Sequence, residues 1–120
     1  MVQQWQADTP IYIQLYQQVV GRIIDGNIQE GEPLPSVRNV AAEYQLNPLT
    51  ISKAYQMLQE EQVVEKQRGK GLFVKSGAQE LMLSREREMF LTQQWPEVVT
   101  QIVRLQLSPQ QLLAELQEQS

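Results

Sequence analysis

Two short apolar stripes, separated by only a few residues, constrain the fold of this chain more than any other feature of the sequence. Within each stripe the apolar side chains recur at positions i, i+3, i+4 and i+7, which places them on one face of an α-helix. The first stripe consists of Val37, Val40, Ala41 and Tyr44, and the second of Ile51, Ala54, Tyr55 and Leu58. The sequence therefore predicts two short amphipathic helices that meet across a tight turn at Leu46.

Residues that favour helix N-termini precede both stripes. Ser36 suits the N-cap of the first helix, and Asn47 followed by Pro48 suits the N-cap and first position of the second. Neither start has a Glu or Gln three residues later, so the fuller capping-box signal is absent. We expect a helix-turn-helix over residues 36–59, with its first helix ending near Gln45.

Another helix is predicted before this pair. Thr9 and Pro10 match an N-cap and a first helical residue, and apolar residues at helical spacing continue the helix to Asp25. Residues 27–35 contain one glycine and two prolines, so we expect an irregular connecting loop there.

A β-hairpin is predicted after the pair. Two β-prone runs within residues 63–75 flank the segment Arg68-Gly69-Lys70-Gly71, whose glycines can adopt the positive φ of a hairpin turn. The chain as a whole is acidic, with a net charge of -4, but this hairpin carries a basic cluster. Phosphate affinity comes mainly from Lys and Arg, so any nucleic-acid surface must be local. The cluster consists of Lys66, Arg68, Lys70 and Lys75.

The composition changes after Gly77 to Glu, Gln and Leu, which predicts a helical tail over residues 78–120. We expect a long helix over residues 78–106, in which Pro96 either causes a kink or lies in the first turn of a second segment, and a last helix beginning at Ser108-Pro109. An apolar seam with heptad-like spacing follows the long helix, and a second stripe follows the last one. The seam consists of Leu91, Trp95, Val98, Ile102 and Leu105, and the stripe of Leu112, Leu113 and Leu116. The predicted fold class is mainly α with a small β-hairpin.

Composition excludes several classes of function. The 120 residues include no cysteine and no histidine, which removes thiolate nucleophiles and metal ligands, the commonest general base and the commonest neutral metal ligand. No phosphate-cradling loop of the GxxxxGK[ST] type occurs. We therefore expect no catalytic residue, no cofactor and no metal. The apolar runs are too short to span a bilayer and the N-terminus lacks a signal-peptide layout, so we expect a cytoplasmic protein without a membrane partner.

The ordered motifs resemble those of the GntR family of bacterial transcription regulators. The resemblance covers residues 9–77 and implies a winged helix-turn-helix DNA-binding domain there, with residues 78–120 as a dimerisation tail. The opening Pro10-Ile11-Tyr12 and the short tail are similar to the YtrA-like subfamily. The motifs that carry the resemblance are Leu34-Pro35-Ser36-Val37-Arg38, Ala41-Ala42, Thr50-Ile51, Ala54-Tyr55, Leu58 and Arg68-Gly69-Lys70-Gly71-Leu72-Phe73-Val74.

The resemblance implies which residues touch DNA. Residues at the start of the first helix of the pair match family positions that contact phosphate or a guanine edge. Residues of the second helix match the recognition helix in the major groove, and residues of the wing match positions that enter or border the minor groove. The expected DNA-binding residues are Ser36, Arg38, Asn47, Leu49, Thr50, Ser52, Lys53, Arg68, Gly69, Lys70 and Gly71. Two departures stand out, because Pro48-Leu49 stands where many relatives carry an arginine or small polar residues, and Leu72 replaces the usual threonine of the wing. At Leu49 a contact with a thymine methyl is the alternative.

The expected function is that of a homodimeric regulator that binds double-stranded operator DNA and represses a small operon, such as one of transporter genes. The expected dimer interface consists of Leu91, Trp95, Val98, Ile102, Leu105, Leu112 and Leu116. Two alternatives stay open: the tail packs back on the first helix of its own chain, or the winged helix is a protein-interaction module without sequence-specific DNA binding. The sequence identifies neither the operator nor a small-molecule effector.

Overall fold

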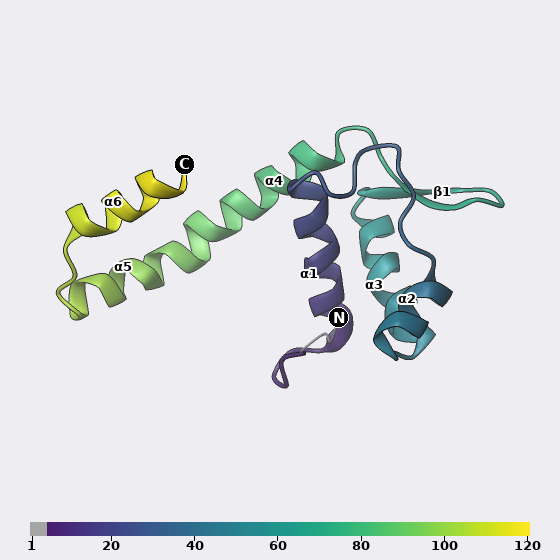
Figure 1. The fold of residues 1–120 in the computed structure, drawn as a ribbon, viewed down its shortest axis with the longest axis horizontal. Helices are drawn as coiled ribbons and strands as arrows, with labels where there is room; N and C mark the ends of the chain where they lie inside the picture. Colours follow the sequence, from purple (N-terminus) through teal and green to yellow (C-terminus); the bar gives the residue numbers. More distant parts are fainter. Residues whose placement is uncertain (1–4) are drawn as a thin grey trace. The chain divides into compact units, whose positions relative to one another are not determined.

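The computed structural model describes residues 5–120 and contains two compact units, one ending at Leu83 and the other beginning at Ser84 (Figure 1). The predicted fold class, mainly α with one hairpin, is confirmed. The elements in chain order are α1 (Ile11–Ile24), α2 (Val37–Tyr44), α3 (Pro48–Glu60), β1 (Val64–Gln67), β2 (Gly71–Val74), α4 (Ala78–Met89), a π-helical segment (Phe90–Gln94), α5 (Trp95–Arg104) and α6 (Pro109–Gln119).

The helix-turn-helix forms as the sequence predicts. The Ser36 hydroxyl accepts a hydrogen bond from the Asn39 N–H at 3.1 Å and caps α2, while the Asn47 side chain caps α3. Between them Gln45 adopts the left-handed conformation, with φ at 55°, and ends α2. The Leu46 N–H then donates to the Ala41 carbonyl at 3.1 Å, which closes the tight turn.

The predicted start of α1 is wrong by one residue. Pro10 was expected as the first helical residue with Thr9 as its cap, but the helix begins at Ile11 and Pro10 is the N-cap, with no side-chain cap bond. The reason is the extended backbone of Pro10, whose ψ is 142°. Its carbonyl accepts from the Ile13 and Gln14 N–H groups and so begins the helical bonding.

The hairpin pairs β1 with β2 in antiparallel register, from Val64 opposite Val74 to Gln67 opposite Gly71. At its tip the Lys70 N–H donates to the Gln67 carbonyl at 2.9 Å, and Gly69 has a φ of 75° that favours glycine. The two glycines of the tip therefore serve the turn as predicted.

The loop before α2 is more regular than the sequence predicts. Pro33 forms an isolated bridge opposite Phe73 on the free edge of β2. The bonds come from its neighbours, because the Leu34 N–H donates to the Leu72 carbonyl at 2.9 Å and the Val74 N–H donates to the Glu32 carbonyl at 2.9 Å. A proline fits this edge because the ladder requires no N–H from its position.

The hydrophobic core lies within the first unit and is formed mainly by α1, α3 and the hairpin. The first turns of α4 also enter it, since Ala78 and Met82 are buried and the Gln79 amide donates to the Ile24 carbonyl at 2.9 Å. This packing explains why the unit extends to Leu83, whereas the sequence suggested a division after residue 77. The core residues are Leu15, Val19, Val20, Ile23, Leu34, Val40, Ile51, Ala54, Tyr55, Leu58, Val63, Val64, Val74, Ala78 and Met82.

The second unit contains the end of α4, the π-helical segment, α5 and α6, with an apolar groove between α5 and α6. Pro96 lies in the first turn of α5, which agrees with the predicted alternative of a second helical segment. The Ser108 hydroxyl caps α6 by accepting from the Gln111 N–H at 3.4 Å. The groove has a volume of about 400 Å³. Its lining consists of Trp95, Val99, Ile102, Val103, Pro109, Leu112, Leu113 and Leu116. In the part of the chain that the structure describes, no helix combines the length and apolarity needed to cross a membrane.

Candidate nucleic-acid interface

The outer face of α3 is defined by what its inner face buries. Because Ile51, Ala54, Tyr55 and Leu58 face the core, the residues between them are left at the surface. Three of the expected DNA-binding residues, Leu49, Ser52 and Lys53, are exposed, whereas Thr50 is half-buried.

Two of the expected DNA-binding residues act first as helix caps. The Ser36 Oγ accepts from the Asn39 N–H, and the Asn47 Oδ1 accepts from the Leu49 N–H at 2.9 Å. These bonds fix the starts of α2 and α3, and so the position of each helix N-terminus. The Ser36 hydroxyl proton and the Asn47 amide N–H₂ remain as donors that suit a phosphate.

Lys53 lies against α1. Its ammonium nitrogen stands 4.1 Å from the centre of the Tyr12 ring, which is cation–π geometry. Lys53 was expected on the DNA surface, and nothing in the sequence indicated its contact with Tyr12. The contact holds the ammonium on the side of α3 that faces the start of α1.

A groove on the other side of α3 brings together three separate elements. It lies between the start of α2, the flank of α3 and both strands of the hairpin, and has a volume of about 440 Å³. Two expected DNA-binding residues, Ser52 and Gly71, line it. The full lining consists of Val37, Ser52, Tyr55, Gln56, Gln59, Lys66, Gly71 and Leu72.

The groove adds three polar residues that the predicted set lacked, namely Gln56, Gln59 and Lys66. Two of them carry a signal in the sequence, because Gln56 and Gln59 follow Ser52 at i+4 and i+7 and so share its face of the helix. Lys66 belongs to the basic cluster of the hairpin, and its place opposite α3 follows from the folding of the hairpin onto that helix. Together these side chains offer an ammonium, two amides and a hydroxyl to an anion.

The cations around this groove are exposed and locally uncompensated. Within residues 5–120, Arg38, Lys66, Arg68 and Lys70 make neither an ion pair nor a side-chain hydrogen bond. Lys75 differs, because its ammonium donates to the Gln62 side-chain oxygen at 2.9 Å. Lys66 lines the groove, and Arg38, Arg68 and Lys70 lie on α2 and in the hairpin turn that border it, so these elements carry unpaired positive charge that attracts phosphate.

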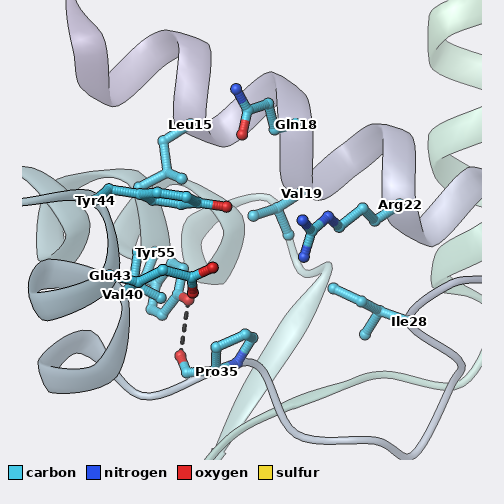
Figure 2. Close-up of a pocket in the computed structure, with 10 residues that line it drawn as sticks. All are labelled: Leu15, Gln18, Val19, Arg22, Ile28, Pro35, Val40, Glu43, Tyr44 and Tyr55. Atoms are coloured by element: carbon cyan, nitrogen blue, oxygen red, sulfur yellow. Dashed lines mark hydrogen bonds between the residues drawn. The ribbon is translucent and has the colours of Figure 1, made fainter. Parts of the chain in front are cut away.

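A hydrogen bond from the core holds the start of α2 in place. The Tyr55 hydroxyl donates to the Pro35 carbonyl at 2.7 Å, directly before the Ser36 cap (Figure 2). The bond borders a cavity of about 40 Å³ that is also lined by Arg22 and Glu43. Burial raises the pKa of Tyr55 to about 12, with a smaller opposing effect of Arg22 and a smaller supporting effect of Tyr44. The phenol therefore stays protonated and able to donate at neutral pH.

Residues 11–74, more than half of the chain, match the profile of the bacterial regulatory proteins of the gntR family. The chain belongs to the GntR family. As a member it is a DNA-binding transcription regulator, and the groove between α3 and the hairpin lies inside the matched segment.

Individual relatives agree with this assignment. The chain is 36% identical over 87 residues to the HTH-type transcriptional repressor YtrA of Bacillus subtilis, an alignment covering 72% of this chain and 67% of that protein. It is similar, at 34% identity and a TM-score of 0.57, to the structure of YtrA from Sulfolobus acidocaldarius, a GntR-family transcription factor, over 72% of this chain and 90% of that one. The resemblance to YtrA-like regulators is thus confirmed.

The fold of the tail has a counterpart as well. A GntR family transcriptional regulator from Listeria monocytogenes superimposes with a TM-score of 0.72 at 23% identity, over 95% of this chain and 98% of that chain. The likeness to this structure shows the same fold, a winged helix followed by a short helical region.

Proposed function

We propose that this GntR-family regulator binds a palindromic operator as a homodimer, with α3 in the major groove and the wing against neighbouring phosphates or the minor groove. The observation that carries the proposal is the groove between α2, α3 and the hairpin, which Lys66, Ser52 and Gln56 line. The unpaired cations Arg38, Arg68 and Lys70 lie on α2 and in the hairpin turn that border it. A groove of that lining suits the phosphate backbone that runs beside an inserted helix.

The dimer half of the proposal is supported by the apolar surface of the tail. Among the predicted interface residues Leu91, Leu105 and Leu116 are more than half exposed, and Ile102 and Leu112 line the groove between α5 and α6. Pairing about a two-fold axis would cover the same surface on both copies. Val99, Val103 and Leu113 extend the predicted interface, because they line the same groove.

The regulatory outcome is proposed from the relatives. The matched Bacillus subtilis protein is named a repressor, and we propose repression here, with no catalytic activity and with the cytoplasm as the site of action. The resemblance to YtrA-like regulators extends the proposal to a small operon of transporter genes. An inverted repeat upstream of the protein's own operon, next to transporter genes, would support this extension, and an operon without a transporter gene would contradict it.

The DNA surface is tested by fluorescence anisotropy with the promoter region of the protein's own operon as the probe. Arg38→Ala and Arg68→Ala each remove one phosphate-facing cation, so each variant is expected to bind about tenfold more weakly and to lower the salt slope by about one. Arg87→Ala is the control, because Arg87 is exposed on α4 and lies outside the groove lining. Wild-type affinity in both variants overturns the proposed surface.

The same titration separates the proposal from the alternative function, a protein-interaction module. A sequence-specific regulator prefers the promoter over a scrambled duplex of equal length, because base contacts add to the phosphate contacts. Equal affinity for both duplexes overturns sequence-specific binding and favours the interaction module.

A further inference from the structure

Leu49 is an outlier in the first unit. Its side chain is 74% exposed, and within residues 5–83 it is the single large apolar side chain with such exposure, because the other exposed ones lie between Met89 and Leu116. It has no part in the hydrophobic core. Folding of the first unit therefore does not account for a leucine at this position.

The position of Leu49 on α3 is well defined. Its N–H donates to the Asn47 cap at 2.9 Å, so its backbone is fixed in the first turn of the helix. The next turn carries Ser52 and Lys53, which are exposed too. Leu49 is therefore an apolar tip on an otherwise polar face, at the end of the helix that enters the major groove first.

The major groove offers one apolar group to such a tip, the C5-methyl group of thymine. Cytosine presents a polar N4 amino donor beside an unsubstituted C5, and purines present polar edges. A leucine side chain accepts and donates no hydrogen bond, so its discrimination comes from contact with that methyl group.

We propose that Leu49 is a specificity-determining residue that selects thymine at one position of each operator half-site by contact with the C5-methyl group. This inference rests on the proposed function. Deoxyuridine lacks the C5-methyl group of thymidine but keeps every hydrogen-bonding group of the base. One methyl group withdrawn from such a contact weakens binding by about fourfold.

The experiment begins with full-length protein and a library of random-sequence duplexes, from which bound duplexes are selected. Each thymine of the enriched duplex is then replaced by deoxyuridine, one at a time, and the affinity is measured by anisotropy. For wild-type protein we expect one position per half-site at which the replacement weakens binding about fourfold.

Three variants assign the methyl effect to the leucine. Leu49→Ala is expected to bind the thymine and deoxyuridine duplexes equally, whereas Leu49→Met restores part of the difference because it returns an apolar tip. Gln17→Ala on the exposed side of α1 is expected to keep the wild-type difference.

The outcomes separate the two proposals. Selection without an enriched sequence overturns the proposed function and the role of Leu49 with it. An enriched duplex in which every thymine tolerates replacement, or a difference that persists in Leu49→Ala, overturns the role of Leu49 alone.

Discussion

The two units treat apolar side chains in opposite ways. Among the described residues, every buried core side chain lies between Leu15 and Met82, and none lies in the second unit. Ten of the eleven exposed large apolar side chains lie in the second unit, from Met89 to Leu116. The first unit buries its apolar side chains in its own core, whereas the second unit leaves many of its apolar side chains exposed to solvent.

This difference indicates where each unit obtains its stability. Burial of apolar surface is the main favourable term in folding, so the first unit has the means to fold by itself. Two helices with a shared apolar groove expose too much apolar surface to be stable alone. A partner must cover the tail, and a second copy is the partner we propose.

The largest expected effect comes from a charge in the tail groove. Ile102→Asp places a carboxylate among Trp95, Val99 and Leu112. Burying a charge against such apolar side chains is costly. We expect a monomer in sedimentation velocity and at least about a hundredfold loss of operator affinity, because the two half-sites are no longer linked. Ile102→Val is the control and should keep the dimer. A dimer in Ile102→Asp would remove the tail groove from the interface.

The next effect contrasts two leucines of the same helix. Leu58 is fully buried in the first unit, so Leu58→Ala is expected to lower the free energy of unfolding by about 3 kcal/mol through loss of contacts and formation of a cavity. Leu49→Ala removes the same atoms from an exposed position and should change it by less than about 0.5 kcal/mol. Urea unfolding measures both. Equal losses would contradict the placement of Leu49 outside the core.

The third effect concerns the hydrogen bond behind α2. The pKa of Tyr55 is about 12 in the folded chain and 10.0 as a reference, so the folded state keeps a proton that the unfolded chain loses above pH 10. Stability is expected to fall between pH 10 and 12, by up to about 3 kcal/mol. Tyr55→Phe should lose about 1 kcal/mol at neutral pH, because the Pro35 carbonyl loses its donor.

Unfolding of wild type and Tyr55→Phe at pH 8 and pH 11 measures this effect. The variant lacks the phenol, so the stability difference between the two proteins should shrink at the higher pH. A difference that stays constant would show that Tyr55 does not titrate with folding.

The smallest effect concerns the turn between α2 and α3. Gln45 holds a φ of 55°, a conformation that glycine adopts without steric strain. Gln45→Gly is expected to raise the free energy of unfolding by about 0.5 kcal/mol without a change in operator affinity. Thermal unfolding and anisotropy check the two parts, and a destabilised variant would show that the turn gains nothing from glycine.

The sequence predicted what depends on local spacing. The stripe that begins at Ile51 defined α3, the Ser36 and Asn47 caps defined the helix starts, and the two glycines at 69 and 71 defined the hairpin turn. Each of these signals lies within a few residues of the feature that it specifies, so no knowledge of the tertiary fold was needed.

Contacts between distant segments were not predictable in this way. The bridge at Pro33 depends on the free edge of β2, about forty residues later, and the place of Lys66 beside Gln56 depends on how the hairpin folds onto α3. The predicted heptad-like seam also lacked Val99 and Val103. These residues line the groove because α6 faces a neighbouring stripe of α5 as well. These features follow from packing between elements, which spacing along one element does not encode.

We propose that a DNA-binding unit with its own hydrophobic core is joined to a tail whose apolar surface is covered only in a homodimer. Sedimentation equilibrium of the full chain with a labelled operator duplex tests it most directly, because it counts chains per duplex. We expect a dimer in the absence of DNA and two chains on each duplex. A single chain per duplex, bound with full affinity and sequence preference, would contradict it.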